Sequence, residues 1–242
     1  MQCVHEFQNT KIYYTKNSKG VGIMKYRSAF DIIGPVMIGP SSSHTAGAAR
    51  IGRVARTLFE KQPKKVKISL YGSFASTYKG HGTDLALVAG LLDFDTFDER
   101  IPKSLEIAKE LGMEVTFQTE KAVPEHPNTV KLNLFDDHNQ MEIIGISIGG
   151  GTIEITEINS FKLKLSGDPA ILVIHRDRFG IISSVTSVLA KYEINIGHME
   201  VARKEKGEMA IMVIEVDQKI EDEVIEELKA LCNVTRVIRM VE

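Results

Sequence analysis

The sequence predicts an α+β protein in which a mixed α/β domain, residues 24–160, precedes a smaller ferredoxin-like domain, residues 168–242. A chain of 242 residues is long enough for two modest domains. Helical stripes and alternating strands succeed one another in the first part. Gly167-Asp168-Pro169 is typical of a boundary, and the pattern after it has the complete order βαββαβ.

The composition favours an ordinary globular protein, with 43% hydrophobic and 26% charged residues. A net charge of -2 argues against nucleic acid as a main partner, because binding to phosphates needs a basic excess. The sequence has no apolar run of membrane-spanning length and no hydrophobic leader, so we expect a cytoplasmic protein without a membrane partner. Cys3 and Cys232 alone provide neither a disulfide framework nor a metal site.

Residues 1–23 have neither helical nor strand periodicity. Two interpretations remain open: a natural tail, or a mis-assigned start with translation beginning at Met24. In either case we expect residues 1–23 to add nothing to the core.

The first domain begins with an apolar helical stripe after residue 43. This stripe consists of Ile51, Val54, Ala55, Leu58 and Phe59. Further helices are expected at 85–92 and 103–111, the latter stopped by Gly112. Alternating apolar residues predict strands at 66–70, 115–117, 130–134, 144–148 and 153–155. Gly149-Gly150-Gly151 indicates a hairpin turn or a bulge between the last two strands.

The second domain, with Asp177-Arg178-Phe179-Gly180 between its first strand and first helix, resembles an ACT domain. The resemblance implies a homodimer through these domains, with a small-molecule amino-acid effector at the interface. Gly180 leaves the amides at the helix start open to a carboxylate, or it makes only a tight turn. Asp177 and Asn195 could meet the effector's polar groups, although both types are common at caps and turns.

Two motifs point to chemistry in the first domain. The run Gly39-Pro40-Ser41-Ser42-Ser43-His44-Thr45 precedes a helix, where hydroxyls and free amides favour a carboxylate or phosphate. The alternative is a multiple N-cap, with Ser43 or Thr45 capping. In Lys79-Gly80-His81-Gly82-Thr83-Asp84, the flanking glycines leave the imidazole unshielded, which is uncommon for a core residue.

A third run, His126-Pro127-Asn128-Thr129, precedes the next expected strand. The spacing of the three histidines matches no common zinc pattern, and no acid or thiol cluster supports them. We therefore expect no metal site in this chain.

Together these motifs resemble the β portion of bacterial iron–sulfur L-serine dehydratases, which convert L-serine to pyruvate and ammonia. The resemblance implies a 4Fe-4S cluster on three cysteines, with one iron open to substrate. Since this chain lacks those cysteines, the resemblance implies that a separate L-serine dehydratase α chain binds the cluster.

The resemblance also implies roles for the candidate residues. His81 would be the base and His44 would bind substrate or assist, since a histidine can move protons near neutral pH. The residues expected to bind substrate are Ser42, Ser43, Thr45, His126 and Asn128, of which the last two have a structural alternative.

The alternative function is a purely regulatory amino-acid-binding module. The first domain also resembles the allosteric-substrate-binding insert of some 3-phosphoglycerate dehydrogenases, which likewise precedes an ACT domain. Such a module needs no reactive histidine, so His44 and His81 in glycine- and hydroxyl-rich loops favour the enzyme subunit.

Overall fold

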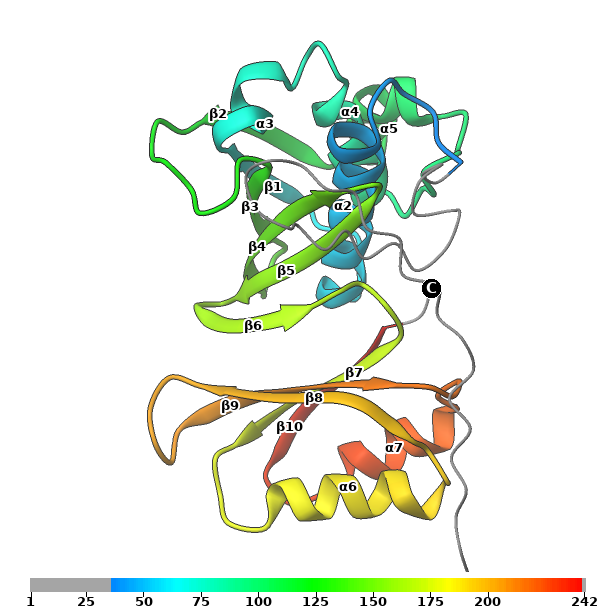
Figure 1. Cartoon of the computed structure of the whole chain (residues 1–242), viewed down its shortest axis with the longest axis vertical. Helices are drawn as coiled ribbons and strands as arrows, with labels where there is room; N and C mark the ends of the chain where they lie inside the picture. The colour runs from blue at the N-terminus through cyan, green and yellow to red at the C-terminus, as the bar shows by residue number, and fades with distance from the viewer. Residues whose placement is uncertain (1–35, 241–242) are drawn as a thin grey trace, which may run out of the picture. The chain divides into compact units, whose positions relative to one another are not determined.

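The computed structural model describes residues 36–240, which form two β-sheets with their helices (Figure 1). One sheet has six strands in the order β2-β1-β3-β4-β5-β6, and the other has four in the order β10-β7-β9-β8. This arrangement confirms the α+β fold class. The segment 1–23 lies outside the described residues, and the domain limits at 160 and 168 stay a prediction.

The first sheet is antiparallel except for the parallel pair β1 and β2. Its strands are β1 (Lys65–Leu70), β2 (Glu114–Thr119), β3 (Thr129–Phe135), β4 (Gln140–Gly149), β5 (Thr152–Ile158) and β6 (Phe161–Leu165). Five of them were expected. Strand β6 was not predicted, although Leu163 and Leu165 are buried and alternate with exposed Lys162 and Lys164.

The β4 strand shows how periodicity can predict an element without giving its face. Ile144, Ile146 and Ile148 alternate as expected, yet the buried positions of β4 are the odd-numbered ones. Ile148 is 52% exposed. Gly145 lies beneath α2 (Gly47–Phe59), because an added Cβ there would stand 2.9 Å from Cγ2 of Ile51. The inward face is therefore set by the close approach of a helix, which only glycine permits here.

The first domain carries short and long helical segments around α2. They are η1 (Ser42–Ala46, a π-helix), α3 (Gly72–Thr77), α4 (Thr83–Leu91), η2 (Ile101–Lys103) and α5 (Ser104–Glu110). All five members of the predicted α2 stripe are buried. Gly149 pairs with Thr152, which confirms the hairpin between β4 and β5.

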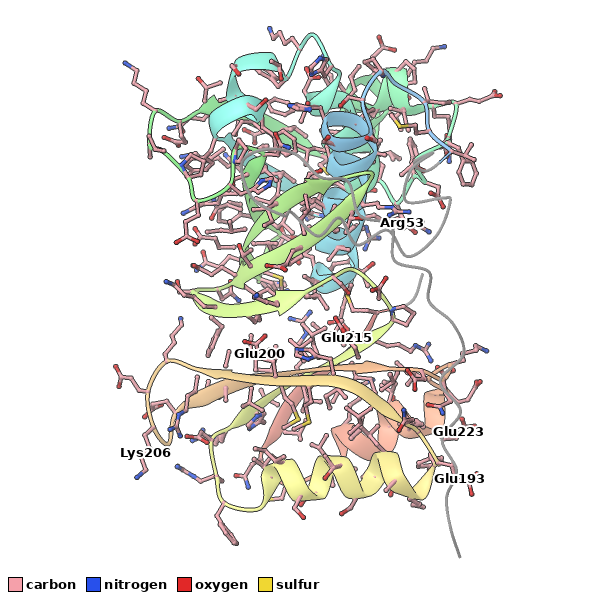
Figure 2. The ribbon with its side chains drawn as sticks, viewed as in Figure 1. Arg53, Glu193, Glu200, Lys206, Glu215 and Glu223 are labelled. Atoms are coloured by element: carbon pink, nitrogen blue, oxygen red, sulfur yellow. The ribbon has the colours of Figure 1, made fainter. Side chains whose placement is uncertain are left out.

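Helices α2 and α4 cross at very short range. A Cβ added to Gly90 would lie 2.0 Å from the carbonyl oxygen of Ala49, and one added to Gly52 would lie 2.3 Å from that of Leu87. Arg53 of α2, which is labelled in Figure 2, also bonds Asp93 and Asp95, just beyond α4. This close packing joins the first half of α2 to the second half of α4, and each of these helices follows one of the two sequence motifs.

The second sheet belongs to the expected βαββαβ order. Its elements are β7 (Ala170–Arg176), α6 (Ile181–Lys191), β8 (Ile196–Arg203), β9 (Met209–Val216), α7 (Asp222–Lys229) and β10 (Val234–Met240). Figure 1 shows both helices on one face of this sheet. Ile171 and Val173 pack in the core beneath them.

The opposite face of the second sheet is covered by the first domain. Leu172, Ile211 and Ile238 share one apolar cluster with Leu58 and Phe59 of α2. Burial on both faces explains the unbroken apolar run at the start of β7.

Polar contacts join the same two parts. The backbone amide of Lys164 donates to Glu200 at 2.9 Å, and the hydroxyl of Ser166 donates to Glu215 at 3.0 Å. Figure 2 labels both glutamates on this face of the sheet. No helix within residues 36–240 combines the length and apolar character needed to cross a bilayer.

Candidate active site

The two motif loops meet at the adjoining ends of α2 and α4. The ring centroids of His44 and His81 lie 4.8 Å apart at an interplanar angle of 67°, an edge-to-face contact. The hydroxyl of Thr45 donates to the carbonyl oxygen of His81 at 3.0 Å. Two histidines 37 positions apart in the sequence therefore share one site, which the sequence motifs suggested but could not locate.

Both ring nitrogens of His44 contact serine hydroxyls. Nε2 lies 2.9 Å from Oγ of Ser73, and Nδ1 lies 3.3 Å from Oγ of Ser41. Phe74 packs against the same ring, with centroids 5.3 Å apart. Burial and the nearby charge of His81 lower the pKa of His44 below its usual value of 6.5. The imidazole of His44 is therefore held at both nitrogens, and its surroundings favour the neutral form.

The capping residue of the first motif is Ser41. Its Oγ accepts the backbone N–H of His44 at 3.1 Å and caps η1, so the alternative with Ser43 or Thr45 as cap is wrong. Thr45 is 3% exposed, and its hydroxyl proton is engaged in the bond to the second loop. Ser42 and Ser43 are half-buried, and their hydroxyls bond no other described residue. These two hydroxyls remain available to a ligand.

His81 is more enclosed than its flanking glycines suggested. It is half-buried, and its Nδ1 is fully buried without a hydrogen-bond partner among the described residues. The expectation of an unshielded imidazole was wrong, because the loop folds back. The amide of His81 donates to the carbonyl of Thr77 at 3.1 Å, and the ring of His44 covers one side. A buried polar atom without a partner costs about 1–3 kcal/mol, which marks this ring for a function.

The third run lies against the start of α3, a few residues before the second motif. The carbonyl oxygen of Pro127 accepts the amide of Ser73 at 2.7 Å. His126 accepts the amide of Asn128 through Nδ1 at 3.2 Å, and the Asn128 side chain donates to the carbonyl of Ser147 at 3.2 Å. These bonds give His126 and Asn128 a structural place beside the site, while their contact with substrate stays a prediction.

Three serines of this site were not among the predicted site residues. Ser41 lies within the first motif run and Ser73 six positions before the second, but their contacts with His44 depend on tertiary packing. Ser147 is fully buried, and its hydroxyl has no partner among the described residues. It lies directly against Gly47, the first residue of α2. Its sequence signal was only a polar residue between isoleucines.

In the second domain, Gly180 precedes α6 with φ of 85°, so the turn itself requires glycine. An added Cβ there would meet nothing within 4 Å, while the first amide of α6, that of Ile181, donates to the carbonyl of Arg178 at 3.4 Å. Asp177 accepts the amide of Gly207 and the guanidinium of Arg203, and these two groups lower the pKa of Asp177.

Asn195 is also engaged in structural bonds. Its side-chain Nδ2 donates to the carboxylate of Asp217, and its backbone N–H donates to the side-chain oxygen of Gln218. The structure thus gives Asp177 and Asn195 local partners, and their contact with an effector stays a prediction.

The described residues do not fit an iron–sulfur cluster or another metal. Within residues 36–240, no three histidine, cysteine or acidic side chains gather where they could hold an ion. Cys232 is exposed, and Cys3 lies outside the described part. Three clustered thiolates are not available from this chain.

The fold and site define a class: a protein with an ACT-type domain whose first domain carries a pair of facing histidines suited to acid–base chemistry. The family described as "Serine dehydratase beta chain" matches residues 28–110, and the family described as "ACT domain" matches residues 170–233.

Relatives extend these matches over most of the chain. The "Probable L-serine dehydratase, beta chain" of Bacillus subtilis is 61% identical over 220 residues, covering 90% of this chain and all of that protein. The "L-serine dehydratase, beta chain" of Peptoniphilus asaccharolyticus is 40% identical, and the match covers 80% of this chain and 88% of that protein. The D-3-phosphoglycerate dehydrogenase of Bacillus subtilis is 26% identical, and the match covers 78% of this chain but only 36% of that protein. The chain belongs to the L-serine dehydratase β-chain family.

Proposed function

We propose that this chain is the β subunit of an L-serine dehydratase that converts L-serine to pyruvate and ammonia together with an α chain. The observation that carries the proposal is the facing pair His44 and His81, in a chain 61% identical to a protein named as such a β chain. The name "beta chain" of both relatives implies a partner chain. The proposal places the 4Fe-4S cluster on that partner, because the described residues offer no thiolate set for it.

The reaction needs a base for the Cα proton of serine. We assign this role to His81, because one ring nitrogen is buried without a partner and the ring lies at the junction of the motif loops. Loss of that proton and of the β-hydroxyl group as water yields an enamine, whose imine form hydrolyses to pyruvate and ammonia. His44, with both nitrogens engaged, assists by holding the site.

The hydroxyls of Ser42 and Ser43 are the best placed of the proposed carboxylate ligands, since they bond no other described residue. They lie in η1, at the N-terminal side of α2, where the helix dipole favours an anion. Thr45 supports them from behind by anchoring the second loop.

The ACT domain supports regulation by an amino acid, for which L-serine is the simplest candidate. We propose a homodimer through these domains, formed at the edge strands or helices, because the other sheet face is covered by the same chain. The cytoplasm is the proposed compartment.

The second candidate is a regulatory module without catalytic residues. The match to a D-3-phosphoglycerate dehydrogenase favours it, because that protein is named for a different reaction. The enclosed histidine pair weighs against it, since a binding module gains nothing from a buried imidazole nitrogen that lacks a partner.

The test is reconstitution with the α chain under anaerobic conditions. The isolated chain should bind no iron and dehydrate no serine. In the complex, His81→Ala should lower turnover by about 10²–10⁴-fold, the usual contribution of a general base. Ser43→Ala should raise KM more than it lowers kcat. His138→Ala, at an exposed position on the first domain, is the control.

The iron–sulfur content of each complex must be measured, so that a loss of turnover caused by a missing cluster is not attributed to the substitution. Near wild-type turnover by a cluster-loaded His81→Ala complex would replace the catalytic role with the regulatory one. Iron bound stoichiometrically by the isolated chain would refute the division of labour between the chains.

A further inference from the structure

Ser73 is the least expected member of the site. It lies in α3, which follows β1, and its Oγ is 2.9 Å from Nε2 of His44, 29 residues earlier in the chain. Ser73 was not among the candidate residues, because nothing in its local sequence separates it from Ser76 or Thr77. Only its contact with His44 in the folded chain distinguishes Ser73 from these two neighbours.

The backbone of Ser73 is fixed at both of its polar groups. Its amide donates to the carbonyl of Pro127 at 2.7 Å. Its carbonyl accepts the hydroxyls of Ser76 at 3.1 Å and Thr77 at 2.8 Å. Gly72 permits this approach, because a Cβ there would lie 2.5 Å from the Pro127 oxygen. The hydroxyl of Ser73 is therefore presented to His44 from a rigid support.

Two hydroxyls satisfy His44 in either neutral tautomer. A neutral imidazole has one donating and one accepting nitrogen, and a serine hydroxyl can serve either. Ser41 contacts Nδ1 and Ser73 contacts Nε2, so the ring of His44 is held at both ends. A ring held in this way has a fixed plane.

His81 depends on that plane. Its Nδ1 has no hydrogen-bond partner among the described residues, so no such bond fixes the ring through this atom. Its ring instead lies against the ring of His44, with centroids 4.8 Å apart. A general base must stand within about 2.6–3.2 Å of the proton donor, so its orientation decides the rate.

We propose that Ser73 is a positioning residue for the reaction: its hydroxyl holds the imidazole of His44 in one orientation, and His44 in turn sets the orientation of His81. This inference rests on the proposed function for its catalytic consequence, but the contact between Ser73 and His44 stands apart from it.

The first test uses the full chain alone, labelled with ¹⁵N in its histidines. In the wild-type chain, the imidazole N–H of His44 should exchange slowly with water and give a resolved signal, assigned by its loss in His44→Gln. Ser73→Ala should lose that signal or average the shifts of the two ring nitrogens. Ser73→Thr, which keeps a hydroxyl, and Ser76→Ala, one turn away, should retain it. An unchanged His44 signal in Ser73→Ala would overturn the proposal.

The second test is a double-mutant cycle in the complex with the α chain. Ser73→Ala should lower kcat by about 10–100-fold with little change in KM, as misplacement of a catalytic group does. In a His44→Ala background, Ser73→Ala should change kcat by less than about twofold, because it acts through His44. An equal loss of kcat from Ser73→Ala in the wild-type and His44→Ala backgrounds would show that Ser73 does not act through His44, and would overturn the proposal. A cluster-loaded wild-type complex without serine turnover would refute the proposed function, while the ¹⁵N spectra would still decide the role of Ser73.

Discussion

Arg236 on β10 donates from Nε to the carboxylate of Glu60 at 2.8 Å, and Glu60 is the residue that ends α2. Glu60 adopts a left-handed conformation with φ of 65°. The other end of α2 continues directly from η1, which carries His44. One helix of thirteen residues therefore joins the second sheet to the candidate active site, and we expect a shift of β10 to be transmitted to His44 through it.

We expect Arg236→Ala to separate regulation from basal activity. Both side chains of the pair are more than a third exposed, so the stability loss should stay below about 1 kcal/mol and shrink with added salt. Basal serine turnover of the complex should be unchanged, while its response to an amino-acid effector should weaken. Lys219→Ala, which removes a more exposed pair with Glu221, is the control. An intact response in Arg236→Ala would remove this coupling route.

Gly47 should tolerate no side chain. A Cβ there would stand 2.1 Å from Oγ and 2.9 Å from Cβ of Ser147. We expect Gly47→Ala to lower the free energy of unfolding by about 1–3 kcal/mol, as overpacking does, and Ser147→Gly to recover part of that loss. Gly80→Ala, whose Cβ would meet only an ordinary contact at 3.6 Å, is the matched control. Urea unfolding is measured for Gly47→Ala, for the double variant Gly47→Ala/Ser147→Gly and for Gly80→Ala. A Gly47→Ala chain as stable as wild type would contradict the prediction, because it would mean that β4 can move away from α2 at no cost in free energy.

Much of the fold follows from periodicity. The α2 stripe, the β4–β5 hairpin and the βαββαβ order were all predicted, because each depends on spacing along the chain. The inward face of β4 was not predicted. Glycine and serine are not typical of a buried strand face, and Gly145 and Ser147 are buried only because α2 packs over them.

The site divides in the same way. His44 and His81 were found because unusual local sequence, hydroxyl runs and paired glycines, surrounds them. Ser73 and Ser147 act through partners far away in the chain, and no local pattern encodes such contacts. The enclosure of His81 was also misjudged, because glycine neighbours report local freedom and not what the fold packs above them.

His44 should make stability depend on pH. Its pKa in the folded chain lies below the value of 6.5 expected when unfolded, through burial first and the charge of His81 second. The unfolded chain then binds more protons as pH falls, so stability is fully present above pH 6.5 and is lost as pH falls towards the folded pKa. We expect part of the decline between about pH 7 and 5 to be absent in His44→Gln. The measurement is urea unfolding across this range, with His138→Gln as the exposed control. Equal pH slopes for His44→Gln and wild type would contradict it.

Gly180 and Gly112 form a matched pair that separates backbone strain from effector binding. Gly180 has φ of 85° before α6, and Gly112 has φ of 75° after α5. Both are exposed, and at neither would a Cβ meet an atom within 4 Å. Replacement by alanine should therefore cost each the same left-handed backbone strain, about 1 kcal/mol, or a fall in Tm of about 2–4 °C.

The two variants should differ only in their response to amino acids. If an effector carboxylate meets the amides that open α6, a methyl group at Gly180 obstructs that approach, whereas one at Gly112 has nothing to obstruct. We expect calorimetry on the full chain to show weakened L-serine binding for Gly180→Ala and wild-type binding for Gly112→Ala. Wild-type binding by both would place the effector elsewhere. Weakened binding by both would mean that lost stability, and not the lost opening at α6, governs the affinity.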